Sequence, residues 1–131
     1  MAKRLGISSK VNFLGGVSDE AIEYLFHQAD LVVLPYLFSV SASGPLSLAM
    51  AYGKPVIASR TEFFEEILGN QCHSVFFPPK DYRTLAQRII EILLDKELAK
   101  QISRKIREKA IELSWERVAS LTLKLYKELV E

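Results

Sequence analysis

Residues 29–59, with the sequence ADLVVLPYLFSVSASGPLSLAMAYGKPVIAS, contain two apolar runs separated by a serine-rich turn and a short stretch of helix formers. Leu31–Pro35 and Pro55–Ala58 are apolar throughout rather than alternating, which is typical of strands covered on both faces. The stretch between them predicts a helix over Pro45–Tyr52, and Gly53 is a natural stop for it. The order strand, turn, helix, strand is typical of an α/β protein.

The turn before the predicted helix is a candidate anion site. Proline is accepted at the first helical position, so Gly44-Pro45 predicts the helix start. The first amides of a helix lack helical partners, and together with the helix dipole they favour a phosphate or another anion. The expected donors are the amides of Leu46, Ser47 and Leu48 and the hydroxyls of Ser41 and Ser43. The local sequence leaves a plainer alternative open, in which SVSASG is a flexible loop with a capping serine.

The rest of the chain continues the alternation of strands and helices. The predicted strands are residues 11–14, 31–35, 55–58 and 74–77. Helices are expected over residues 18–28, 45–52, 62–68 and 81–94, then through Leu98, Ile102 and Ile106, and finally from Trp115 onward, with Ser18 and Asp81 as N-caps. This pattern predicts a single α/β domain over residues 1–131, with a parallel sheet of about four strands and helices on both faces.

Composition is that of an ordinary globular domain, with 131 residues, 49% hydrophobic residues, 25% charged residues and a net charge of +1. This balance gives no sign of a nucleic-acid partner. Cys72 is the single cysteine, so an intrachain disulfide is excluded and a reducing, cytoplasmic location is expected. No apolar run approaches the length of a transmembrane segment. A solvated helix face is expected for the basic stretch of Lys100, Arg104, Lys105, Arg107 and Lys109.

Other chemistries have little support in the sequence. Cys72 and His73 are one pair, which falls short of the ligands of a zinc site, and neighbours on a strand point to opposite faces. His27 lies near a predicted helix end, where it is expected to stabilise that terminus. Trp115 is expected to anchor the last helix by packing. We therefore predict no metal, no cofactor and no catalytic side chain in this chain.

Several short motifs occur in an order and spacing that resemble a known family. They are VNFLG at residues 11–15, ADLVVLP at 29–35, AMAYGKPVIAS at 49–59, EIL at 66–68 and SW at 114–115. Residues 11–118 resemble the C-terminal part of the glycosyltransferase group 1 family, retaining enzymes with the GT-B fold. The resemblance implies a partial Rossmann-like domain, amounting to about the last third of a family member.

The resemblance also implies a function. The full enzyme would bind a nucleotide diphosphate sugar and transfer its glycosyl group to an acceptor hydroxyl, and the isolated chain would lack activity because the acceptor domain is missing. The implied donor contacts are backbone around Leu14, Gly15 and Gly16 for the base, Glu66 for the sugar pocket, and Ser41, Ser43, Gly44, Leu46 and Ser47 for the distal phosphate.

The chain departs from the family pattern in two ways. Val40 and Leu48 stand where the family usually has two glutamates, so no carboxylate contacts the ribose from this helix. The family's strand order, 3-2-1-4-5-6, would leave a two-strand gap between Val11–Leu14 and Leu31–Pro35. An open gap would expose strand edges and apolar faces. We expect either that these two strands pair directly or that a second copy fills the gap.

The partners expected on this basis are the sugar nucleotide and either a missing N-terminal domain or a homodimer. A non-catalytic flavodoxin-like binding or interaction domain is the main alternative, and a non-functional remnant that folds as a dimer is a third.

Overall fold

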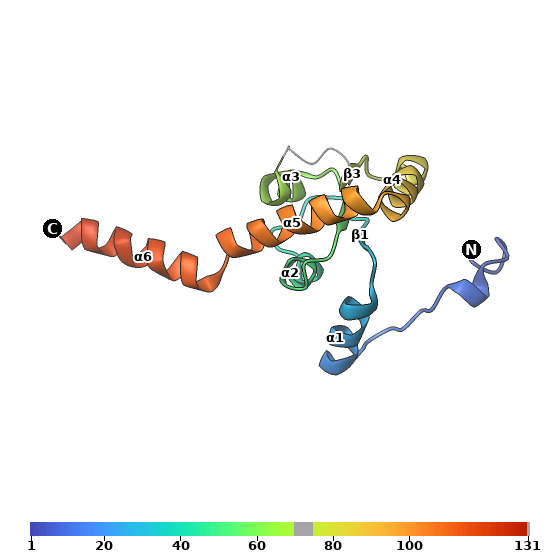
Figure 1. Cartoon of the computed structure of the whole chain (residues 1–131), viewed down its shortest axis with the longest axis horizontal. Coiled ribbons are helices and arrows are strands. Elements are labelled where there is room, and N and C mark those ends of the chain that lie inside the picture. The colour runs from blue at the N-terminus through green and yellow to red at the C-terminus, as the bar shows by residue number, and fades with distance from the viewer. Residues whose placement is uncertain (70–74, 131) are drawn as a thin grey trace.

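A computed structural model describes residues 1–69 and 75–130, and Figure 1 shows how their elements are arranged. The helices are α1 (Asp19–Gln28), α2 (Gly44–Ala51), α3 (Glu62–Leu68), α4 (Tyr82–Leu94), α5 (Lys96–Glu112) and α6 (Trp115–Val130), preceded by a 3-10 turn, η1 (Ser8–Lys10). The strands are β1 (Val32–Leu34), β2 (Val56–Ser59) and β3 (Phe76–Phe77). Strands therefore alternate with helices from α1 to α4, as the sequence predicts.

The sheet is parallel, with the strand order β1-β2-β3. Val32 pairs with Val56 on one side of β2, and Ala58 pairs with Phe76 on the other. Every residue of β2 is fully buried. Because alternate residues of a strand point to opposite faces, both faces of the middle strand are covered. The predicted α/β class with a parallel sheet is confirmed.

The core lies where α2, α4 and α5 meet the sheet. Helix α5 contacts α2, α3, α4 and β2, so it holds the other elements together (Figure 1). Its inward residues, Ile102 and Ile106, are buried, as their spacing of four residues predicts. The largest fully buried side chain is Phe64 of α3. The other core positions on helices are Leu46, Ala49 and Met50 of α2 and Ile92 of α4.

The prediction of a fourth strand at Val11–Leu14 is wrong. The described residues form three strands, and residues 11–14 run as irregular chain between η1 and α1, away from the sheet (Figure 1). Phe13 is 87% exposed and Leu14 is 55% exposed. Apolar, β-favouring residues suffice for the prediction of a strand. A strand also needs a neighbouring strand to complete its hydrogen bonds, and residues 11–14 have none among the described residues.

Because residues 11–14 do not join the sheet, one edge of β1 is unpaired in the described residues. Within residues 1–69 and 75–130, β1 pairs with β2 only, so direct pairing between residues 11–14 and 31–35 is also wrong. Filling of this edge by a second copy or by a missing domain stays a prediction. The last predicted strand shortens to Phe76–Phe77, and Cys72, His73 and Ser74 lie outside the described residues.

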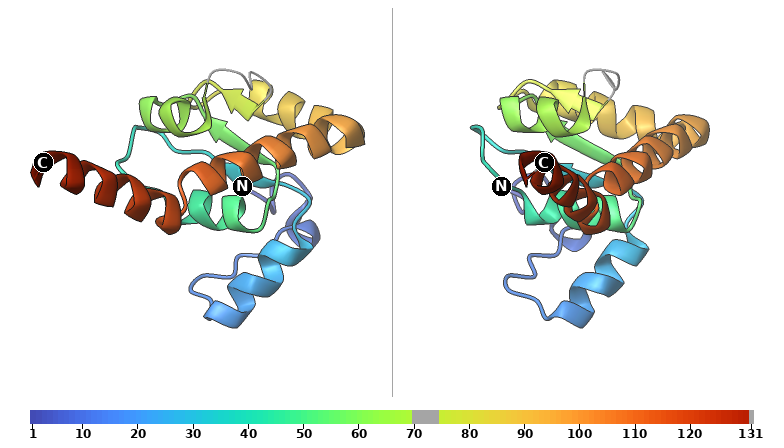
Figure 2. Two further views of the ribbon diagram at one scale, coloured as in Figure 1. Left: turned by 60° about the vertical axis from the view of Figure 1, so that its left-hand side comes forward. Right: turned by 90° about the vertical axis from the view of Figure 1, so that its left-hand side faces the viewer.

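Helix α6 extends away from the rest of the chain in Figure 1 and in the left view of Figure 2. No residue of α6 is buried, and Trp115 is 85% exposed, so the prediction that Trp115 anchors this helix is wrong. The apolar face predicted for the helix is present, but none of its residues is buried against the described parts of the chain. None of the helices in the described parts is both long enough and apolar enough to cross a bilayer.

The start of α4 leads to a test of the predicted cap. Asp81 accepts hydrogen bonds from the amides of Thr84 at 3.0 Å and Arg83 at 3.1 Å, and from the Thr84 hydroxyl at 2.7 Å. The amide hydrogen bond from Thr84 is the main cause that lowers the pKa of Asp81 below its usual value. The pKa of this carboxyl group in the unfolded chain is about 3.9, so the cap stabilises the fold fully above that pH. The stabilisation is lost as the pH falls through the lower pKa of the folded chain.

We expect Asp81→Ala to lower Tm at pH 7, and Asp81→Asn to lower it less because asparagine also caps. The Tm difference between the parent chain and Asp81→Ala should shrink as the pH is lowered below about 3.9. Thermal denaturation of the three chains across this range is the measurement. An Asp81→Ala difference that is the same at pH 7 and pH 3 would show that the ionised carboxylate does not act as the cap.

Candidate functional site

The serine-rich turn leads directly from β1 into α2, and Ser43 is the residue that caps the helix. The Ser43 hydroxyl accepts a hydrogen bond from the Leu46 amide at 3.3 Å, and the Ser43 carbonyl accepts one from the Ser47 amide at 3.0 Å. Gly44 is the first helical residue and Pro45 the second. This is the arrangement that a capping serine followed by proline favours.

The cap corrects one part of the predicted anion site. The amides of Leu46 and Ser47 were expected to be free, but both donate to Ser43. The helix begins at Gly44 rather than at Pro45, which places Leu46 and Ser47 where the cap residue satisfies them. In the described part of the chain, the Gly44 amide has no recorded partner and is the donor left at this terminus.

Ser43 is held in place from the core side. Its hydroxyl lies 3.0 Å from the hydroxyl of Tyr36, and Ser43 is only 6% exposed. The Tyr36 ring packs edge-on against the buried ring of Phe64, with 5.1 Å between centroids. Ser43 is therefore linked through Tyr36 to the hydrophobic core, and the capping serine of the alternative interpretation is confirmed.

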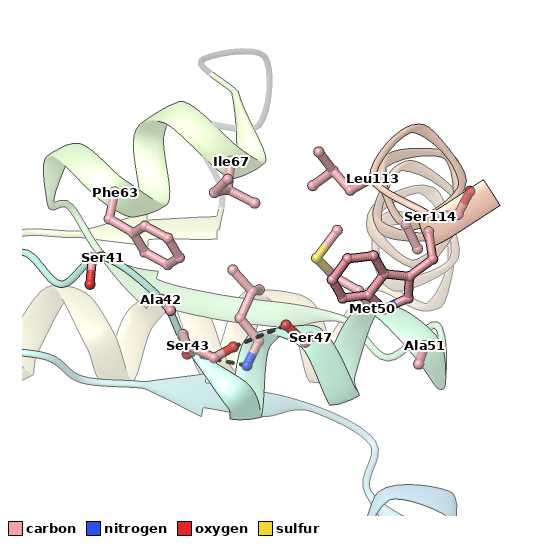
Figure 3. Close-up of a pocket in the computed structure, with 13 residues that line it drawn as sticks. Ser41, Ala42, Ser43, Ser47, Met50, Ala51, Phe63, Ile67, Leu113 and Ser114 are labelled. Atoms are coloured by element: carbon pink, nitrogen blue, oxygen red, sulfur yellow. Dashed lines mark hydrogen bonds between the residues drawn. The ribbon is translucent and has the colours of Figure 1, made fainter. Parts of the chain in front are cut away.

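A pocket of about 500 Å³ opens beside this turn (Figure 3). The turn and α2 form one side, α3 forms a second, and the end of α5 with the start of α6 forms the third. The side chains on the walls are serine, alanine or apolar, and none of them is charged. The lining residues are Ser41, Ala42, Ser43, Leu46, Ser47, Met50, Ala51, Phe63, Ile67, Ala110, Leu113, Ser114 and Trp115.

The polar groups of the pocket lie mainly on the turn. The Ser47 hydroxyl donates to the Ser43 carbonyl at 3.2 Å, so it is already engaged (Figure 3). Ser41 is exposed, and no hydrogen bond of its hydroxyl is recorded with the described residues. With the Gly44 amide and the helix dipole, Ser41 gives the turn a capacity for one anionic group. The lining residues supply no cation to neutralise a full diphosphate.

The structure brings together some of the predicted site residues and separates others. Ser41, Ser43, Leu46 and Ser47 line the pocket, and Gly44 begins the helix between them. Leu14, Gly15 and Gly16 lie in the irregular segment before α1, and Glu66 lies exposed on α3; none of these four lines the pocket. Contacts of these four residues with a base or a sugar stay predictions.

Trp115 and its neighbours Leu113 and Ser114 are among the pocket residues that the sequence did not assign to the site. The Ser114-Trp115 motif was the available signal, but a tryptophan in an amphipathic stretch is normally a core residue. No group of three or more His, Cys, Asp or Glu side chains that could bind a metal occurs among residues 1–69 and 75–130.

Comparison with known proteins places this geometry in a family. Residues 1–109 match the family model described as Glycosyl transferases group 1. An uncharacterized glycosyltransferase of Methanocaldococcus jannaschii is 30% identical over 125 residues, which cover 95% of this chain and 32% of that protein. An MMP alpha-(1->4)-mannosyltransferase of Mycolicibacterium hassiacum is 30% identical over 129 residues, covering 96% of this chain and 31% of that protein.

A solved structure gives the same result for the fold. Sucrose-phosphate synthase from Thermosynechococcus elongatus superimposes with a TM-score of 0.81 and 27% identity, covering 98% of this chain and 32% of that one. The chain thus spans about a third of the length of the relatives it matches. Its parallel sheet and helices match part of a GT-B glycosyltransferase fold. The chain belongs to the group 1 glycosyltransferase family.

Proposed function

We propose that this chain is the donor-binding part of a group 1 glycosyltransferase, and that it binds a nucleotide diphosphate sugar at the start of α2. The observation that carries the proposal is the turn Ser41–Gly44, which follows β1, lines the pocket with Ser41, Ala42 and Ser43, and begins α2 at Gly44. In open α/β sheets, ligands bind beyond the carboxyl ends of the strands, where helix N-termini favour anions. Family membership supports the same ligand class.

The contacts within the turn define what the chain would contribute to transfer. The Gly44 amide and the Ser41 hydroxyl donate to the distal phosphate, and the helix dipole stabilises the negative charge that develops on the leaving diphosphate. The amide of Leu46 becomes available only if the Ser43 hydroxyl releases it. The uncharged walls of the pocket suit the neutral glycosyl group.

Completion of the active site requires residues beyond those described. The pocket lining contains no Lys or Arg, and two thirds of each matched relative lie outside the part that this chain matches. We propose that equivalent residues, on the same or another polypeptide, cover the free edge of β1, neutralise the diphosphate and bind the acceptor. The 131 residues alone should therefore bind the donor without transferring its sugar.

Calorimetric titration of the 131-residue chain with UDP, GDP and ADP tests donor binding and identifies the base. We expect saturable binding of at least one nucleotide, and about tenfold weaker binding by Ser41→Ala, because a hydrogen bond to a charged group is lost. Ser9→Ala, which removes an exposed hydroxyl from η1, is the matched control and should bind like the parent chain. A folded chain that binds none of the three nucleotides would contradict the proposal.

A further inference from the structure

A second hollow, of about 450 Å³, lies at the other end of α2 from the serine-rich turn. Its walls are the residues just before β1, the α2–β2 connection, and one face of α5. Strands β1 and β2 begin next to it, so the hollow lies at the edge of the sheet where the amino ends of these strands meet. It shares no lining residue with the pocket at the serine-rich turn.

The hollow is strongly basic. Among the described residues, four cationic side chains and one carboxylate, that of Asp30, line it. Lys100, Arg104 and Arg107 are spaced four and three residues apart on α5, which places them on one face of the helix. Lys54 joins them from the α2–β2 connection. The solvated face expected from the sequence is therefore one wall of a concave cationic cluster.

Neighbouring carboxylates neutralise this cluster only in part. Glu97 pairs with Lys100 at 2.8 Å, but both side chains are more than 70% exposed, and such pairs contribute little. Glu108 lies 3.9 Å from Arg104. In the part of the chain that the structure describes, no carboxylate lies within ion-pair distance of Lys54 or Arg107. These two cations are available to a ligand.

Contacts with the backbone hold Lys54 and Arg107 in place. The ammonium group of Lys54 donates to the carbonyl of His27 at 2.9 Å, which fixes its place and leaves two N–H donors. Arg107 lies directly over Gly53, where an added Cβ would overlap the guanidinium Nε. Gly53 is buried and has a φ of 60°, a conformation that side chains rarely adopt. The glycine that ends α2 thus also makes room for Arg107.

We propose that this hollow binds a ligand that carries phosphate groups, with a pyrophosphate group as the fitting unit. Guanidinium groups bind phosphate oxygens bidentately, and ammonium groups add point charges. A small ligand is favoured over a nucleic acid or a flat membrane, because the cations line one hollow and Glu97 and Glu108 interrupt the stripe along α5. This site is independent of the proposed donor site.

Calorimetric titration of the 131-residue chain with inorganic pyrophosphate, at low ionic strength, tests the proposal. We expect saturable binding that Arg107→Gln and Lys54→Gln each weaken at least tenfold and that added salt weakens further. Lys105→Gln is the matched control, because it removes the same charge from α5 at a position that does not line the hollow. Pyrophosphate bound at the start of α2 would be lost in Gly44→Asp and kept in Arg107→Gln, whereas pyrophosphate bound in this hollow would show the opposite pattern, which separates the two sites.

A flotation assay with phosphatidylcholine vesicles, with and without phosphatidic acid, then identifies the source of the phosphate. Binding to the anionic vesicles that pyrophosphate reverses would indicate a lipid headgroup, and failure to float would indicate a free ligand. Melting curves recorded for each variant show whether it is folded. The proposal is overturned if the folded parent chain binds no pyrophosphate, or if Arg107→Gln and Lys105→Gln bind it equally.

Discussion

Phe64→Ala is expected to lower the free energy of unfolding by about 3–5 kcal/mol. Phe64 is fully buried, and its ring contacts Tyr36 on one side and Phe63 on another, with centroid distances of 5.1 and 5.3 Å. Removing the ring deletes buried apolar surface and leaves a cavity that the surrounding strands and helices fill only partly. A loss of this size is a large fraction of the stability of a domain.

The Phe64→Ala substitution should also disturb the candidate site. Phe64 supports Tyr36, and the Tyr36 hydroxyl contacts the hydroxyl of Ser43, which caps α2. Denaturant unfolding of the parent chain, Phe64→Leu and Phe64→Ala gives the measurement, and we expect the leucine variant to lose less. A loss below about 1 kcal/mol for Phe64→Ala would show that this ring is not packed in the core.

Gly44→Asp is expected to weaken binding of the nucleotide at least tenfold, whereas Gly44→Asn should bind nearly as the parent chain does. A Cβ added at Gly44 meets nothing within 4 Å, so both side chains can be accommodated. The two variants have nearly the same shape and differ in charge. Only the aspartate places a negative charge beside the amide that we propose holds the phosphate, where like charges repel.

The stability of the Gly44→Asp variant serves as the control for this experiment. A carboxylate in the first turn of a helix interacts favourably with the dipole, so Gly44→Asp should not unfold α2. Loss of nucleotide binding by a chain of unchanged or higher Tm therefore reports on the site. Equal binding by the aspartate and asparagine variants would place the phosphate elsewhere.

Local features of the fold could be predicted because nearby residues determine them. Ser18 and Asp81 cap α1 and α4, as expected, because a cap depends on a few neighbouring residues. The apolar runs of β1 and β2 and the Gly53 stop were also readable from the sequence. Contacts between distant segments were not. Among the described residues, the segment Val11–Leu14 pairs with no strand although its residues favour one, and the apolar ring of Trp115 stays exposed.

The candidate site shows the same division. The turn at Ser41–Gly44 could be predicted from the sequence. However, α2 begins one residue earlier than predicted, and the Leu46 amide donates a hydrogen bond to Ser43, so the available amide is that of Gly44. The hollow lined by Lys54 and Arg107 was not predictable, because these residues are far apart in the sequence and α5 alone reads as a solvated basic helix.

The central claim is that the start of α2 binds the diphosphate of a sugar nucleotide. An NMR titration of the isotope-labelled chain with UDP, GDP and ADP, following each backbone amide, tests it most directly. We predict that one nucleotide shifts the amide signal of Gly44, with those of Ser41 and Ser43, in a saturable manner. Shifts confined to the residues around Lys54 and Arg107, or no saturable shift in a folded chain, would contradict it.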